Sequence, residues 1–388
     1  MTHSHETRSD NAKPMKQKLD SLQVGRGVAA FMVLLFHSQV FMLLVHPESA
    51  FAHMFGFGRT GVDFFFVLSG FLMVYVHRGD FGLPRRLGVY AYKRLTRIYP
   101  VYWVLCAGLI PLVLLVPSVT QNQGKTTLAT LLMSVFLVPH EGARLIGITW
   151  SLEYELIFYL SLVAFFISVR LGLALFATWF VAIAAVGIWG PSTLNSIGTP
   201  QLSPFILGFI LNLHVGEFML GMVAAWLVAR GARVGAPRAL LVAALAAAAA
   251  FAAYEANFLP EDQTLRSVIA IYGVLAAIIV FAVVQTELRY QVRIPRWLTL
   301  LGAASYAIYL THYLVVAFAI VVAKHWPAIA TIPAPLLLLA LLPLGLAPGI
   351  ALHLLVERPL LLMFATRLQK REAHVEGGPP IVPNVAVG

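Results

Sequence analysis

The chain has 388 residues, of which 60% are hydrophobic and 11% are charged, and its mean hydropathy is +0.83. Because soluble domains carry about 25% charged residues, this composition excludes a soluble fold and predicts an all-α, polytopic membrane protein. A net charge of +10 would by itself also suit a nucleic-acid-binding protein, and the single Cys106 excludes an intramolecular disulfide.

Ten segments are long and apolar enough to cross a bilayer as helices. Between the third and fourth, Leu128 to Val138 is apolar but too short to cross, so we expect a re-entrant or interfacial segment there. Residues 1–18 and 367–388 are expected to be disordered cytoplasmic tails on either side of a membrane domain at 19–366. The ten spans are expected at about 24–45, 57–77, 98–117, 149–169, 171–190, 204–229, 238–256, 266–285, 298–323 and 335–364.

Basic residues gather on one side of these spans. With the N-terminus in the cytoplasm, all 27 Lys and Arg residues lie on the inner side except Arg59, Lys125, Arg144, Arg266 and Lys324. Cytoplasmic loops of membrane proteins carry such an excess, so both termini are expected in the cytoplasm. The topology thereby explains the positive charge, and we expect membrane lipids and no nucleic acid as partners.

The first span, V-G-R-G-V-A-A-F-M-V-L-L-F-H, holds one ionisable side chain in its apolar run, His37, eleven residues after Arg26. Eleven residues of helix rise about 16 Å and turn by nearly whole turns, so the two side chains share a face. An ionisable group inside a membrane is by default a functional hypothesis. The alternative is a histidine that only hydrogen-bonds a neighbouring helix.

The second and third spans add an acid and a pair of bases. Asp63, in G-V-D-F-F-F-V-L-S-G-F, lies about 9 Å below the outer end of its span and needs a partner or water there. Arg94 and Arg97 are three residues apart, share a helix face and run directly into the third span. This spacing favours anion binding, whereas the positive-inside bias alone would explain some arginines at that place.

The fourth span begins T-W-S-L-E-Y-E, with Glu153 and Glu155 on opposite helix faces. One of these carboxylates could simply face interfacial water. Three later spans carry further ionisable or hydroxyl side chains, namely His214, Glu217, Ser305, Tyr306, Tyr309, His312, His353 and Glu357.

Depth separates these groups into two levels. His37, Asp63 and Glu155 are expected in the outer half of the membrane, above Arg26, Arg94 and Arg97 at the cytoplasmic boundary. A histidine beside a carboxylate can act as general base towards a hydroxyl, and arginines bind phosphates through paired donors. The pattern predicts a long ligand with an anionic head inside. No metal is expected, because no H-x-x-x-H or H-x-x-E-H spacing occurs, and no G-x-S-x-G supports a nucleophilic serine.

The motifs together resemble those of the integral-membrane acyltransferase-3 family. They are R-x₁₀-H, G-V-D-F-F-F-V-L-S-G-F, R-L-T-R-I-Y-P, W-S-L-E-Y-E, S-Y-A-I-Y-L-T-H and a late E-R-P, spread over Leu19 to Phe364. The Q-V-G-R opening and the Y-W after the arginine pair are most similar to the branch associated with exopolysaccharide production. By position, the family's functional residues correspond to Arg26, His37, Arg94, Arg97 and Glu155. Glu153 stands where the family usually has a small or polar residue, so which of the two glutamates acts stays open.

This resemblance implies an O-acetyltransferase of the bacterial inner membrane. It would take acetyl from cytoplasmic acetyl-CoA, a co-substrate, and place it on a hydroxyl of a glycan or lipid-linked saccharide. Arg26, Arg94 and Arg97 would hold the CoA phosphates, and His37 would act as base, oriented by Glu155 or Asp63. Direct transfer and a transient acyl-histidine both fit. The alternative from another class is a proton-coupled transporter or flippase of a glycolipid, with the histidine and carboxylates as a proton relay.

Overall fold

The computed structural model describes residues 19–115, 127–142, 144–189, 205–258, 265–290 and 292–376. Within these residues the regular structure is entirely helical, and ten helices are long and apolar enough to cross a membrane, which confirms the predicted fold class and number of spans. The α-helices are α1 (Asp20–Val45), α2 (Ala50–His53), α3 (Gly61–His77), α4 (Leu87–Leu115), α5 (Leu128–Val135), α6 (Trp150–Ser161), α7 (Val163–Ile167), α8 (Val169–Trp189), α9 (Phe205–Ile210), α10 (Leu213–Ala229), α11 (Pro237–Phe258), α12 (Leu265–Tyr290), α13 (Arg296–Ala303), α14 (Ser305–His325), α15 (Ala334–Leu352) and α16 (Arg358–Glu376). Short 3₁₀ turns are η1 (Gly56–Thr60), η2 (Pro84–Arg86), η4 (Gly147–Thr149) and η6 (Pro327–Thr331), and η7 (His353–Glu357) is a π-helical turn.

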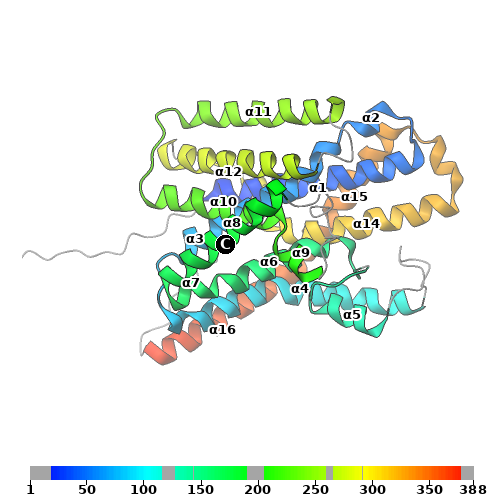
Figure 1. Ribbon diagram of the computed structural model, residues 1–388. Helices are drawn as coiled ribbons and strands as arrows, with labels where there is room; N and C mark the ends of the chain where they lie inside the picture. Colours follow the sequence, from blue (N-terminus) through cyan, green and yellow to red (C-terminus); the bar gives the residue numbers. More distant parts are fainter. Residues whose placement is uncertain are drawn as a thin grey trace, which may run out of the picture.

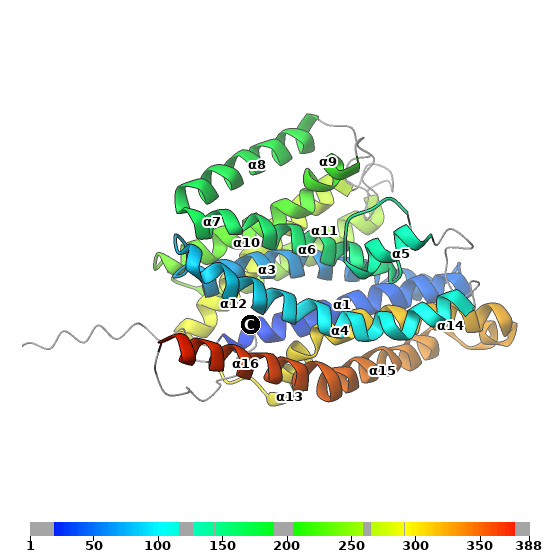
Figure 2. The same ribbon diagram turned by 90° about the horizontal axis from the view of Figure 1, so that it is seen from below.

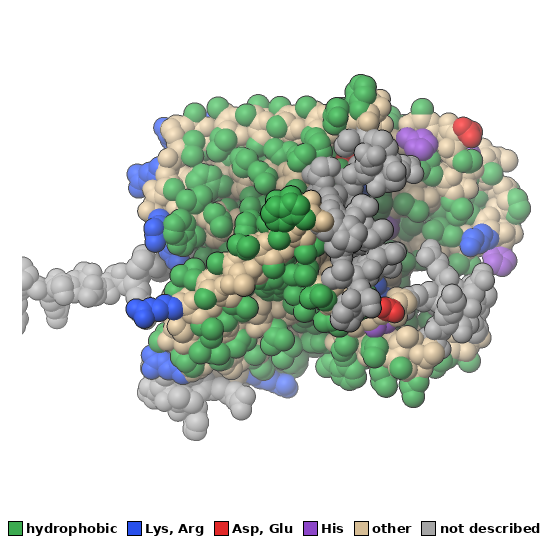
Figure 3. Space-filling model, in the orientation of Figure 1, with side chains coloured by type: hydrophobic (Ala, Val, Ile, Leu, Met, Phe, Trp, Pro, Cys, Tyr) green, Lys and Arg blue, Asp and Glu red, His purple; other side chains and the backbone are tan. Residues whose placement is uncertain are grey.

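The long helices run roughly parallel to one axis as a single bundle (Figures 1 and 2). Helices α1, α3 and α10 run through its middle, α11 and α12 lie along one edge, and α4 with α16 lies along the opposite edge. On the face drawn in Figure 3, most Lys and Arg side chains are at one end of the bundle. This is the end that the positive-inside argument assigns to the cytoplasm.

Close contact between α3 and α10 fixes the centre of the bundle. A Cβ atom on Gly70 would lie 1.9 Å from the carbonyl oxygen of Phe218, and one on Gly221 would lie 1.9 Å from that of Val67. Because lipid chains are as apolar as side chains, membrane helices associate through such close packing of small residues. Aromatic rings fill the space beside this crossing, with Phe66 and Phe218 at 4.7 Å between centroids.

Three of the differences from the predicted boundaries have a local cause. The third span extends back to Leu87, because the basic segment before it continues the helix. The ninth is interrupted at Ala304, where Gly302 packs against the backbone of Gln23 and α13 ends. The tail expected from residue 367 is helical as far as Glu376, because R-L-Q-K-R-E-A contains strong helix formers and no Gly or Pro. The expected tail at 1–18 and the rest of the C-terminal one lie outside the described residues.

Candidate active site

Two small cavities lie one behind the other inside the bundle. The first, about 90 Å³, contains all three predicted arginines, Arg26 from α1 and Arg94 and Arg97 from α4. The second, about 100 Å³, contains His37 from α1 and Asp63 from α3. We call them the arginine cavity and the histidine cavity. Val62 and Tyr309 line both, so the two spaces are adjacent.

The arginine pair of α4 is buried, with Arg94 and Arg97 each 9% exposed. The Nη2 atom of Arg94 is 3.1 Å from His77 Nε2, and the guanidinium of Arg94 lies over the ring of Tyr159. However, Nε of Arg94 and both Nη atoms of Arg97 find no hydrogen-bond partner among the described residues. Buried donors are normally satisfied, so these three point to an anionic ligand in the cavity.

Glu357 is the nearest carboxylate to Arg97, at 3.7 Å between Oε1 and Nη1, and it is fully buried. It belongs to the π-helical turn η7, in which its other oxygen accepts from His353 Nδ1 at 2.7 Å. Single π-turns often occur at functional sites, because the widened turn re-aims a side chain. The sequence alone predicted no role for this glutamate.

Glu155 lies in the arginine cavity, not beside His37 as its expected depth implied. Its Oε1 accepts hydrogen bonds from Ser69 Oγ at 3.1 Å and from the hydroxyl of Tyr159, one turn further along α6. The expected depth of Glu155 was wrong because α6 starts inside the bundle. Its first residue, Trp150, already lines the histidine cavity, with its ring 5.4 Å from that of His214. Glu155 lies five residues further along α6 than Trp150, and this distance brings it to the arginine cavity.

Glu153, on the opposite face of α6, is fully buried and paired with Arg144. The pair is bidentate, with Nε–Oε1 at 2.6 Å and Nη2–Oε2 at 2.9 Å. Neither glutamate oxygen is left to face a cavity, so this residue holds the loop before α6 to the helix. Of the two glutamates, the one placed to meet a ligand is Glu155.

His37 is held by a second histidine. Its Nδ1 lies 2.9 Å from the carbonyl oxygen of Val33 and 3.3 Å from Nε2 of His312, which comes from α14. Neither Asp63 nor Glu155 is among the hydrogen-bond partners of the His37 ring in the structure. His312, fully buried, was noted in its motif but was not assigned a role from sequence.

The hydrogen bonds fix the tautomers of this pair. His312 Nδ1 lies 2.9 Å from the carbonyl oxygen of Ile308, so Nδ1 carries the proton and Nε2 accepts. For the same reason His37 Nδ1 must be the protonated nitrogen facing the Val33 carbonyl. In a neutral ring, Nε2 of His37 then keeps a free lone pair. This is the protonation state that a general base requires.

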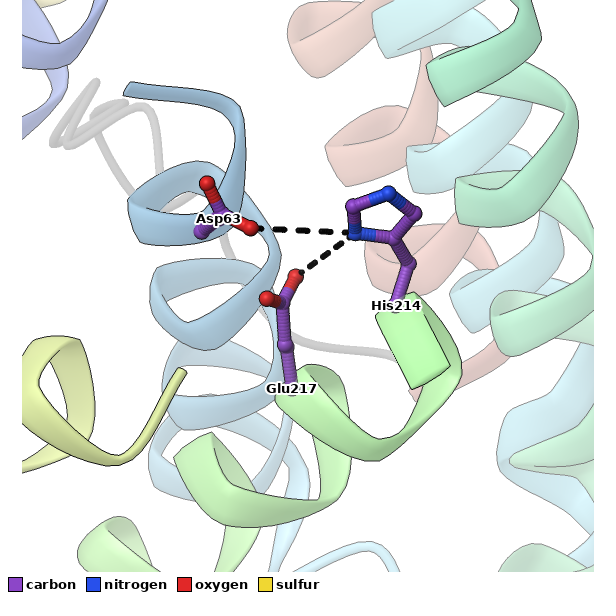
Figure 4. A group of neighbouring side chains, drawn as sticks. All are labelled: Asp63, His214 and Glu217. Atoms are coloured by element: carbon purple, nitrogen blue, oxygen red, sulfur yellow. Dashed lines mark hydrogen bonds and ion pairs between the residues drawn. The ribbon is translucent and has the colours of Figure 1, made fainter. Parts of the chain in front are cut away.

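Asp63 contacts a different histidine. Its Oδ1 is 3.8 Å from Nδ1 of His214, which also lies 3.2 Å from Oε2 of Glu217, and all three side chains converge as Figure 4 shows. The three residues are buried, and one ligand atom of each lies within 4.8 Å of the others. Among the described residues this group could hold a cation, and the expectation that no metal is needed stays a prediction.

Arg26 and His37 face the same interior column, as their spacing predicted, one in each cavity. The helix rise between them is about 16 Å. Arg26 lies close enough to Arg97, Glu357 and Glu155 to interact with their charges. A ligand with an anionic head at the arginines and a reactive group beside His37 would have to be long, thin and flexible.

Comparison with known proteins identifies the family. Residues 19–354 match an acyltransferase domain, that of the acyltransferase-3 family. The chain is 30% identical over 334 residues to the exopolysaccharide production protein ExoZ of Rhizobium meliloti (strain 1021), covering 82% of this chain and 94% of ExoZ. It is 27% identical over 381 residues to the acyltransferase MdmB of Streptomyces mycarofaciens, covering 91% and 94% of the two chains. No solved structure is significantly similar. The chain is thus a multi-pass membrane O-acyltransferase that belongs to the acyltransferase-3 family.

Proposed function

We propose that the protein transfers acetyl from cytoplasmic acetyl-CoA to a hydroxyl group of an exopolysaccharide or surface glycan at the bacterial inner membrane. The observation that carries this proposal is the arginine cavity, in which three buried guanidinium nitrogens have no hydrogen-bond partner among the residues that the structure describes, next to the cavity of His37. Phosphates of CoA suit such donors. The name of ExoZ supports an exopolysaccharide acceptor.

The donor would bind with its phosphates at Arg26, Arg94 and Arg97. Its flexible pantetheine arm would pass Val62 and Tyr309, whose side chains must move aside to join the two cavities. This arm carries the thioester, and it has the long, thin shape that the 16 Å helix rise between Arg26 and His37 demands. Glu155, hydrogen-bonded to Ser69, would position the guanidinium groups.

Transfer would then use His37 as base. Its Nε2 takes the proton of the acceptor hydroxyl while that oxygen attacks the thioester carbonyl. The C–S bond breaks, and the CoA thiolate takes up the proton from His37 to leave as the thiol. An alternative order, in which Nε2 first accepts the acetyl group, uses the same residue and the same free lone pair. His312 would hold the ring in the productive orientation in both cases.

The proposal is tested by the acetyl content of the glycan made by cells that carry only a variant chain. His37→Ala should abolish glycan acetylation while the protein still accumulates in the membrane, because one substitution scarcely changes the hydropathy of α1. His325→Ala, a histidine exposed at the end of α14, is the matched control and should leave acetylation unchanged. Acetylated glycan in cells with the His37 variant would overturn the assignment.

A further inference from the structure

A third, much larger space lies on the outside of the bundle. It is a groove of about 880 Å³ between α1, α11 and α12, and its walls are almost entirely apolar. On α12 it extends from Tyr272 to Val283, a rise of about 16 Å. Helix α11 forms its outer wall and is itself loosely held, since only Pro237 and Ala244 among its side chains are buried. In a bilayer such a groove would be filled by hydrocarbon, because an empty one forfeits dispersion contacts.

The groove ends beside the histidine cavity. Phe57 and Thr60 of η1 line the groove, and Arg59 between them lines the cavity of His37. One short turn therefore forms the partition between a space for a hydrophobic chain and the space in which the acceptor hydroxyl is proposed to react. The opposite end of the groove is bordered by Ser21 and Arg293, at the basic end of the bundle.

A charge cluster closes this partition. Arg59 forms an ion pair with Glu255 of α11, and the same carboxylate accepts a hydrogen bond of 3.0 Å from the hydroxyl of Tyr272. The Arg59 side chain is 28% exposed and that of Glu255 is 13% exposed, so the pair lies at the edge of the bundle and not in its core. Because the Arg59 side chain is still 28% exposed, its guanidinium is accessible to an anionic group other than Glu255.

We propose that the groove binds the lipid chain of a phosphate-linked saccharide acceptor, and that Arg59 exchanges Glu255 for the phosphate of that lipid. The chain would lie between α11 and α12, the phosphate would contact the guanidinium, and the sugar would extend past η1 towards His37. Glu255 would keep the hydroxyl of Tyr272 as a partner. The inference rests on the proposed function for the identity of the sugar hydroxyl as the reacting group. Of the two acceptors expected from the sequence, it selects the lipid-linked sugar, and it adds the site that holds its lipid chain and phosphate.

The test is photolabelling of the full-length protein in phosphatidylcholine nanodiscs without acetyl-CoA. The probe is prenyl phosphate-linked glucose with a diazirine on the prenyl chain, and its reference is the same prenyl glucoside without phosphate. We expect the phosphate probe to label α11 or α12 and to bind at least about tenfold more tightly than the reference, as a charge-assisted contact implies. Arg59→Gln should remove this tenfold difference.

Glu255→Gln should have the opposite effect and tighten binding of the phosphate probe a few-fold, because it frees Arg59 from its competitor. Lys324→Gln removes an exposed cation at the end of α14 that does not line the groove or the histidine cavity, and as the charge control it should change nothing. In the groove, Ala248→Trp should block labelling, whereas Ala250→Trp, on the exposed face of the same helix, should not. Thermal melting of each variant shows that it is folded.

Labelling that is equal for both probes and unchanged in Arg59→Gln would show a groove filled by bulk lipid and would overturn the proposal. If Arg59→Gln and Glu255→Gln weaken binding of the phosphate probe equally, the proposal is also overturned, because the ion pair would then only stabilise the structure. These outcomes are separate from the proposed activity. If the phosphate probe binds as expected but the wild-type protein transfers no acetyl, the acetyltransferase proposal fails and the lipid site stands.

Discussion

Replacing Arg97 with alanine is expected to weaken acetyl-CoA binding by about 1.5–3 kcal/mol. Both of its Nη atoms are buried without a hydrogen-bond partner in the described part of the chain, so the side chain has donors to give to a phosphate. A hydrogen bond to a charged group contributes about 1.5–3 kcal/mol, which corresponds to a roughly 10- to 150-fold rise in Kd. Arg97 also lies 3.7 Å from the buried Glu357, so losing this ion pair should lower the melting temperature, and affinity is measured at a temperature at which both proteins are folded.

Arg97→Lys should recover little of this affinity, because an ammonium lacks the planar fork that matches a phosphate. Isothermal titration of acetyl-CoA into the purified protein measures both variants. Arg85→Ala, an exposed arginine just before α4, is the matched control and should bind as the wild type does. Unchanged affinity for acetyl-CoA in both Arg97 variants would refute the inference that Arg97 binds the phosphates of CoA.

Three further predictions follow from the packing around the site. His312→Phe keeps a ring but removes the acceptor facing His37 Nδ1, so the transfer rate measured with purified protein should fall about tenfold while acetyl-CoA affinity is kept. Glu153→Gln should lower the melting temperature, since breaking a buried ion pair costs about 3–5 kcal/mol, whereas Glu155→Gln should reduce acetyl-CoA binding with little loss of thermal stability. Gly70→Ala should destabilise the bundle in a thermal melt, because its Cβ would collide with a backbone carbonyl of α10; an unchanged melting temperature in either stability test would contradict the packing described.

Much of the architecture could be predicted because hydropathy and helix geometry are local properties. The ten spans follow from apolar length, and the spacing of Arg94 and Arg97 placed both in one cavity. The eleven residues between Arg26 and His37 likewise put the two side chains on one interior column. Each of these inferences needs only the period and rise of one helix.

The level of Glu155 could not be predicted in this way. Counting residues from the start of a span assumes that the span starts at the membrane surface, and α6 starts beside the histidine cavity instead. Contacts between residues that lie far apart in the sequence could not be predicted either. His37 and His312 are 275 residues apart, and the contact of Glu357 with Arg97 depends on a π-turn that no local pattern announced.

In the proposed function, acetyl passes through the protein from CoA at the arginine end to an acceptor at the other end. Proteoliposomes of one orientation, with labelled acetyl-CoA supplied only on the side of the arginine end, test it directly. We expect label on an acceptor glycan at the opposite face, free CoA on the side of supply, and loss of both in the His37→Ala protein. Movement of a glycolipid that proceeds equally well without acetyl-CoA, with no label transferred, would contradict it.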